Sequence, residues 1–137
     1  MEATIHRADG SVSVIRKDNM IVDVGFDFIA DAIGRASGRP APMSHIAIGE
    51  STTPVSANQT NLLYASVSRV ATYEHVEGSK TFRISATFGP GEGTGAITEA
   101  GVFNAGSGGT MLDRVVFNVI NKGEDDTLTV VFTFNMS

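Results

Sequence analysis

Residues 95–117, GAITEAGVFNAGSGGTMLDRVVF, form the most strongly patterned stretch of the chain. Two apolar, β-favouring runs, Ala96 to Phe103 and Met111 to Phe117, flank the segment from Asn104 to Thr110. Three glycines in that segment can adopt the positive φ angles that a chain reversal needs, so the pattern predicts a β-hairpin. Both runs carry apolar residues at odd and even positions, which is typical of strands covered on both faces. We therefore expect this hairpin at the middle of the domain.

Glu99 and Arg114 are the only long charged side chains near the centre of the predicted hairpin. A carboxylate in a buried strand is costly unless it is paired, and an arginine on the neighbouring strand satisfies it most simply. The sequence therefore predicts a structural Glu99–Arg114 ion pair, with Arg69 or Arg83 as alternative partners of the carboxylate. No nucleophile or base accompanies the pair, as a reaction would require.

Length and composition restrict the class of protein. A chain of 137 residues is long enough to form one domain with a core that needs no disulfides, and it contains no cysteine to supply a thiolate metal site or nucleophile. The net charge of -5 and the scattered Lys and Arg residues argue against a nucleic-acid partner. No apolar stretch approaches the ~20 residues needed to span a bilayer, so no membrane partner is expected. The abundance of Gly, Val, Ile, Thr and Phe favours an all-β class.

The N-terminal segment contains Asp9-Gly10 between two short runs from Thr4 to Ile15, a common signal for a two-residue hairpin turn. This hairpin has few apolar residues, so it should either pair with the main sheet or project as an arm that a neighbour covers. The arm interpretation divides the chain into an N-terminal β-hairpin arm over residues 1–18 and a single β-sandwich domain over residues 19–137.

One helix is predicted, from Phe26 to Arg35, where apolar residues repeat at helical spacing. Asp23 is suited to cap its start, and Gly34 or Gly38 to end it. Its broad apolar stripe predicts that the helix covers one face of the central hairpin.

Alternating or continuous apolar runs predict the remaining strands, which are Met20 to Val24, Ser44 to Ile48, Leu62 to Val76, Thr81 to Phe88 and Thr127 to Met136. The third of these slips in its alternation between Val67 and Val70. The polar loop from Gly49 to Asn61 has a length typical of functional, interfacial or mobile loops. The chain is thus predicted to be mainly β: an antiparallel β-sandwich, jelly-roll-like, with one short α-helix.

No motif indicates a catalytic residue, a bound cofactor or a metal ligand set. The three histidines, His6, His45 and His75, lack ligand spacing and are interpreted as ordinary strand or loop residues. The acidic run Glu124, Asp125 and Asp126 lacks the alternating oxygen ligands of a calcium loop and is interpreted as a solvated turn. The glycine-rich segments lack the following helix that would direct amide groups at a phosphate.

Four segments together resemble small structural proteins of tailed-bacteriophage virions: NMIVDVGFDFIADAIG (19–34), MSHIAIGESTTPVSANQTNL (43–62), ATFGPGEGTGAITEAGVFNAGSGGTMLDRVVF (86–117) and DTLTVVFTFNMS (126–137). The ITEAGVFN run, the glycine-rich turn and the following ML-x-R resemble a hairpin motif of tail-collar and tail-fibre proteins. The resemblance implies a non-enzymatic role in a virion assembled in the bacterial host cytoplasm. Expected partners are other virion proteins, capsid or tail subunits, and further copies of this chain in a homo-oligomer.

The sequence leaves open which role in the virion the protein has, and whether it belongs to a different class of protein. The leading one is a capsid decoration or cement protein, and the alternative is a neck, tail or tail-fibre component. A host-surface glycan-binding β module is a different class, for which exposed aromatic side chains would be needed to stack on sugar rings. The sequence offers only Tyr64 and Tyr73 for that role beside phenylalanines that pattern as core.

Overall fold

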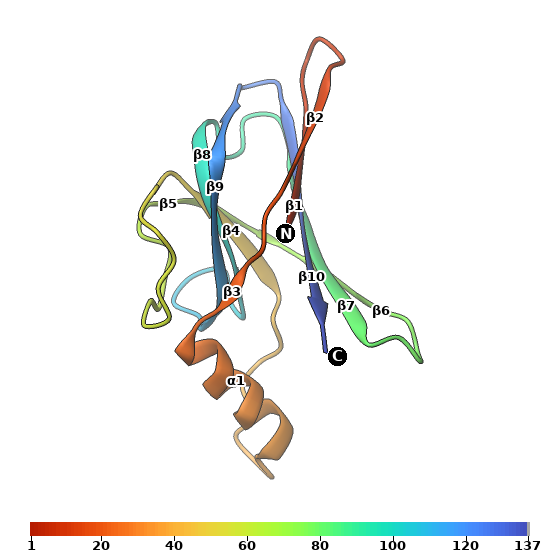
Figure 1. Ribbon diagram of the computed structural model, residues 1–137, viewed down its shortest axis with the longest axis vertical. Coiled ribbons are helices and arrows are strands. Elements are labelled where there is room, and N and C mark those ends of the chain that lie inside the picture. Colours follow the sequence, from red (N-terminus) through yellow and green to blue (C-terminus); the bar gives the residue numbers. More distant parts are fainter. Residues whose placement is uncertain (137) are drawn as a thin grey trace.

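The structure, a computed structural model, describes residues 1–136. Its helix is α1 (Asp23–Gly34), and its strands are β1 (Glu2–His6), β2 (Val12–Arg16), β3 (Met20–Ile21), β4 (His45–Gly49), β5 (Ala65–Val70), β6 (Thr72–His75), β7 (Thr81–Phe88), β8 (Gly95–Phe103), β9 (Met111–Lys122) and β10 (Thr127–Asn135). Two five-stranded antiparallel sheets, ordered β2-β1-β10-β7-β6 and β3-β9-β8-β4-β5, pack face to face (Figure 1). The predicted β-sandwich with one short helix is confirmed.

The predicted central hairpin is formed by β8 and β9, and β8 is the middle strand of its sheet. Its inner face packs into the main core between the two sheets. Its outer face contributes Phe103 and Met111 to a second, smaller core, which is completed by Val22, Ala47 and Leu62. The hairpin is therefore covered on both faces, which is why its strands carry apolar residues at odd and even positions.

Bulges in the β8–β9 ladder add to this mixed pattern. The register shifts between Ile97 and Glu99, and again between Val102 and Phe103. Because the first shift skips one residue, Ile97 and Ala100 both reach the main core although they differ in parity. β9 also continues to Lys122, well beyond the predicted end of the hairpin at Phe117.

The predicted strand from Leu62 to Val76 is in fact two strands in different sheets. β5 pairs with β4 in one sheet, and β6 pairs with β7 in the other. The chain crosses between the sheets at Ala71, whose N–H donates to the Ser44 carbonyl at 2.8 Å. The segment is therefore irregular on both sides of the predicted slip, at a register shift in β5 just before Val67 and at Ala71. Regular pairing starts only at Ala65 because the preceding backbone N–H groups bind a side chain instead of a strand.

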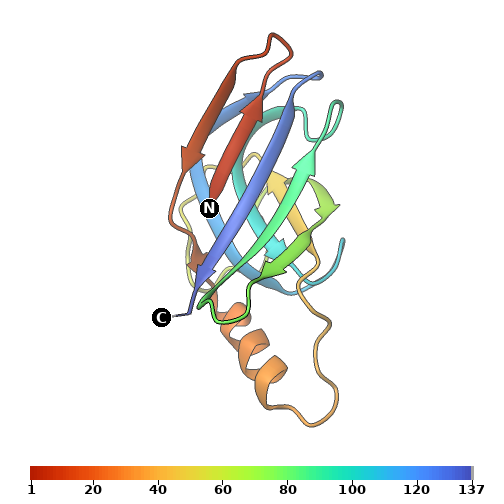
Figure 2. The ribbon, with the colours of Figure 1, turned by 90° about the vertical axis from the view of Figure 1, so that its right-hand side faces the viewer.

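The N-terminal hairpin is part of the sheet that contains β10, so it does not project as an arm; pairing with a sheet was one of the two possibilities that the sequence left open. β1 pairs along its whole length with β10 (Figure 2). Ala3 and Ile5 are buried in the main core, whereas Val12 and Val14 of the edge strand β2 are about half exposed. β1 is therefore a core strand of the sandwich, and β2 forms its edge.

The helix forms close to the predicted residues, but its place in the fold differs from the prediction. It starts at Asp23, which is its first residue and not its cap, because Val22 occupies the N-cap without a side-chain hydrogen bond. The preceding strand is correspondingly short and ends at Ile21. A Cβ at Gly25 would overlap the Leu112 carbonyl oxygen, so only glycine lets the first turn lie this close to β9. Beyond that contact α1 leaves the end of the sandwich (Figures 1 and 2), and the prediction that it covers a face of the central hairpin is wrong.

We expect Ile5→Ala to lower the free energy of unfolding by about 2–5 kcal/mol, because it opens a cavity in the main core. Val12→Ala on the exposed edge of the same hairpin is the matched control and should change it by no more than about 0.5 kcal/mol. Urea denaturation of both variants checks this. Equal, small effects would show that β1 behaves as a detachable arm.

Candidate functional site

Glu99 and Arg114, predicted as an ion pair, meet on the outer face of the β8–β9 hairpin. Arg114 Nη2 lies 3.0 Å from Glu99 Oε1, and Arg114 Nε donates to the same oxygen at 3.0 Å. Both side chains are fully buried. Arg69, one of the alternative partners, instead pairs with Glu92 at 2.8 Å.

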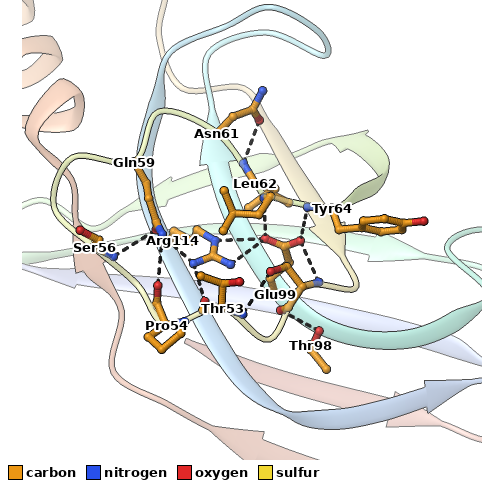
Figure 3. A network of polar contacts seen from close by, with 12 residues as sticks. Thr53, Pro54, Ser56, Gln59, Asn61, Leu62, Tyr64, Thr98, Glu99 and Arg114 are labelled. Carbon is orange, nitrogen blue, oxygen red and sulfur yellow. Dashed lines mark hydrogen bonds and ion pairs between the residues drawn. The ribbon is translucent and has the colours of Figure 1, made fainter.

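The carboxylate of Glu99 also binds the backbone of the loop that follows β4. Its Oε2 accepts hydrogen bonds from the N–H groups of Ser51 (3.0 Å) and Tyr64 (2.8 Å), and its Oε1 accepts one from Leu63 at 3.1 Å (Figure 3). A Cβ at Gly49 would overlap the Tyr64 carbonyl oxygen, so the start of the loop can approach only without a side chain. Both ends of the loop are thus fixed to one buried carboxylate.

Arg114 holds the middle of the same loop. Its Nη1 donates to the Thr53 carbonyl and to Gln59 Oε1, each at 3.0 Å. Gln59 Nε2 in turn donates to the Pro54 carbonyl at 3.1 Å. The loop predicted to be functional, interfacial or mobile is therefore folded down over the hairpin by the ion pair (Figure 3). We assign this network a structural role, because its charged groups are consumed by loop contacts.

Asp113 is a buried acid that the sequence analysis did not single out. Its Oδ2 accepts a hydrogen bond from Asn19 Nδ2 at 2.7 Å, and its Oδ1 accepts one from the Val102 N–H at 3.3 Å. Burial raises the pKa of Asp113 from 3.8 to about 8, against the opposing effects of the Val102 N–H, the positive charge of the Met1 amino group and the Asn19 amide. Periodicity could not indicate that Asp113 is buried, because a polar residue that interrupts an apolar run can equally well be exposed.

The acidic turn between β9 and β10 is only partly solvated, which corrects the prediction for Asp126. Glu124 and Asp125 are exposed, but Asp126 is buried. Its Oδ2 accepts hydrogen bonds from the Gly123 N–H at 2.7 Å and Arg7 Nη1 at 2.9 Å, and its Oδ1 accepts one from the Ala8 N–H at 3.1 Å. The Gly123 hydrogen bond is the main reason why the pKa of Asp126 is lowered. Asp126 thus connects this turn to the β1–β2 turn.

The predicted histidines and tyrosines are dispersed over the molecule. His6, His45 and His75 lie on three different strands, β1, β4 and β6. Across residues 1–136 no group of three or more His, Asp or Glu side chains is placed to hold a metal ion. Tyr64 and Tyr73 are both more than half exposed. Over the same residues, no helix has the length and apolar character required to cross a bilayer.

An apolar groove of about 720 Å³ opens at the end of the sandwich from which α1 projects. One wall is formed by Phe28, Ile29 and Ile33 of α1, and the other by the inner face of the sheet that contains β7 and β10. On that face Phe82 stacks on Phe134 with ring centroids 4.9 Å apart. Among residues 1–136, Arg39 supplies the only charged side chain that lines the groove. The groove exists because α1 leaves the end of the sandwich without closing it.

The rim of this groove carries large apolar side chains in contact with solvent. The exposed fractions are 75% for Ile33, 62% for Tyr73 and 62% for Met136, and Phe26 on the same helix is 58% exposed. Contiguous exposed apolar surface of this kind marks interaction sites in soluble proteins. Periodicity did not indicate this surface, because the whole apolar stripe of the helix was expected to pack on the hairpin. The stripe is broad, since it includes both Phe26 and Phe28, and this breadth was the sequence signal that one neighbouring element would not cover it.

No protein-family model, curated protein or solved structure matches the chain. The resemblance to virion proteins therefore depends only on the sequence motifs quoted above. The groove and its rim are the surface of this protein from which a function can be argued.

We expect Glu99→Ala to lower the free energy of unfolding by about 3–5 kcal/mol, because it leaves Arg114 buried and unpaired. Glu2→Ala is the matched control, since it removes a carboxylate from an ion pair with Arg16 that is largely exposed, and it should cost at most about 1 kcal/mol. Chemical denaturation measures both values. Hydrogen exchange of residues 51–64 should accelerate only in the Glu99 variant, and unchanged exchange would contradict the assignment of the pair as the loop anchor.

The stability of the fold should fall as the pH rises from about 5 to about 8. Because burial raises the pKa of Asp113 to about 8, the folded protein keeps a proton that the unfolded chain has already released, so stability is highest below the unfolded pKa and is lost as pH rises through the folded one. Asp113→Asn should flatten this dependence. Urea midpoints at both pH values measure it, and an equally steep decline in the variant would exclude Asp113 as the cause.

Proposed function

We propose that this chain is a non-enzymatic structural protein of a tailed-bacteriophage virion that binds other virion subunits, with capsid decoration as the leading placement. The observation that carries the proposal is the apolar groove beside α1, together with its exposed apolar rim. Surfaces of this kind are typical of proteins that dock on other proteins.

The rest of the sandwich supplies a rigid support for such a surface. The Glu99–Arg114 pair fixes the longest loop, and Asp126 fixes two turns at the opposite end from α1 (Figure 1). A surface held on a rigid scaffold loses little conformational entropy when it binds, so more of the contact energy remains as affinity. This favours a protein that is a permanent part of an assembly.

The sheet edges offer a second means of attachment. β6 is an edge strand whose four residues are all exposed, and Tyr73 on it lines the groove. A segment of a capsid subunit could therefore add as a strand beside β6 and place every second side chain in the groove. Backbone hydrogen bonds would supply affinity, and the apolar groove would supply selectivity.

Two other placements are kept as alternatives: a neck, tail or tail-fibre component, and a host-surface glycan-binding module. The exposed rings of Tyr64 and Tyr73 favour the glycan-binding alternative, since such rings can stack on sugars. Binding of the isolated protein to host-surface glycans would support that alternative, provided that replacing these tyrosines by alanine abolishes it.

The test of the virion role is the copy number of this protein in purified particles, measured by quantitative mass spectrometry against the major capsid protein. A ratio close to equimolar is expected for a decoration protein bound over the capsid lattice. A ratio far below equimolar would instead place it at the neck, tail or fibres. Its absence from the particles would overturn the virion role.

A further inference from the structure

We propose that α1 packs against the α1 of a second copy of this chain, antiparallel across a two-fold axis, through the face that carries Phe26, Ala30 and Ile33. This inference deepens the proposed assembly role, on which its biological meaning rests, by naming one partner for the α1 end of the molecule. The partner is another copy, and the interface is isologous, so the same patch is used on both chains.

α1 has more apolar surface than packs against its own chain. Phe28, Ile29 and Ala32 are half-buried and face the groove. Phe26, Ala30 and Ile33 follow at i, i+4 and i+7, so they share a neighbouring side of the helix, and all three are exposed. A surface helix normally presents only polar side chains to water, whereas this one presents a second apolar side next to the polar stripe formed by Asp23, Asp27 and Asp31.

The shape of this second side suits a close helix pair. Gly34 lies on it, one turn after Ala30, and a Cβ built there would face open space. When two such helices cross antiparallel at Ala30, Phe26 of each copy lies opposite Gly34 of the other. A large side chain then packs on a small one at both ends of the contact, which lets the helix axes approach.

The charges of the helix are complementary to themselves in the antiparallel arrangement only. Asp23 and Asp27 lie in its first half, whereas Arg35 and Arg39 follow its end, and the one acid of its second half, Asp31, is already paired with Arg35 at 3.1 Å. An antiparallel pair therefore places the acidic half of each helix beside the basic end of the other, twice. Asp27 and Arg39 are available for this, because neither forms an ion pair within residues 1–136. A parallel pair would bring like charges together.

The same pairing would cover the groove at its most exposed point. Ile33 belongs both to the groove lining and to the proposed contact face. A contact between two 12-residue helices alone buries less than the roughly 1,000 Å² expected of a stable interface. We therefore expect the exposed rim residues Tyr73 and Met136 to take part, and we expect a dimer that dissociates on dilution.

Sedimentation equilibrium of the purified full chain over a range of concentrations tests the dimer. The protein should be dimeric at high concentration, and Ile33→Asp should make it monomeric. Val70→Asp is the matched control, because Val70 is as exposed as Ile33 (76% against 75%) but lies on β5, so it should leave the dimer intact. Unchanged thermal melting of both variants would show that the fold survives. A wild-type monomer at every concentration, a trimer, or a dimer that Ile33→Asp leaves unchanged would overturn the proposal.

Cysteine cross-linking tests the antiparallel geometry, since the chain contains no cysteine of its own. A mixture of Phe26→Cys and Gly34→Cys chains should form a disulfide-linked heterodimer under mild oxidation far more efficiently than either variant alone. Preferential self-linking of each variant would indicate a parallel pair and overturn the proposal. Neither experiment needs virions. A confirmed dimer that is absent from particles would refute only the virion role. A protein that is present in particles but monomeric would refute only the dimer.

Discussion

The fold depends on the buried ion pair between Glu99 and Arg114. Two charges removed from water are stabilising only when their mutual attraction is joined by enough hydrogen bonds to replace the lost hydration. The β8–β9 hairpin cannot supply these bonds, because its own backbone groups are used in the sheet. The loop after β4 supplies them instead, through N–H groups at both of its ends and a carbonyl and an amide in its middle. One charge pair thus determines what covers the outer face of the central hairpin.

The position of the helix follows from that arrangement. With the loop over the outer face of the hairpin, and Leu62 completing the second core there, α1 adds Val24 of its first turn to that core but does not cover the face. Its first turn approaches β9 closely at Gly25, Phe28 and Ile29 reach the edge of the main core, and the rest continues past the end of the sandwich. The apolar stripe that would have been buried on the hairpin therefore remains partly exposed and borders an open groove. The surface on which we base the function is a consequence of how the charge pair is satisfied.

Polar side chains in this protein stabilise connections more than they form reactive sites. Asp126 joins the β9–β10 turn to the N-terminal hairpin. Asp113 accepts a hydrogen bond from Asn19 and so holds the segment before β3. Each acid is buried, and each binds groups distant from it in the sequence. These charged groups are used within the fold, so the proposed assembly role is argued from the exposed apolar surface beside α1.

The sequence alone determined the local elements whose signals are strong. Alternation predicted β7 with its observed bounds and β10 to within one residue. Mixed parity indicated that the β8–β9 hairpin is covered on both faces, and the isolated charges of Glu99 and Arg114 indicated that they pair. Only the tertiary structure decided what covers the hairpin, where α1 lies, that Ala71 separates two sheets, and that Asp113 and Asp126 are buried. The physical reason is that periodicity reports which side chains avoid water, whereas the identity of the covering element depends on hydrogen bonds and space shared by segments far apart in the chain.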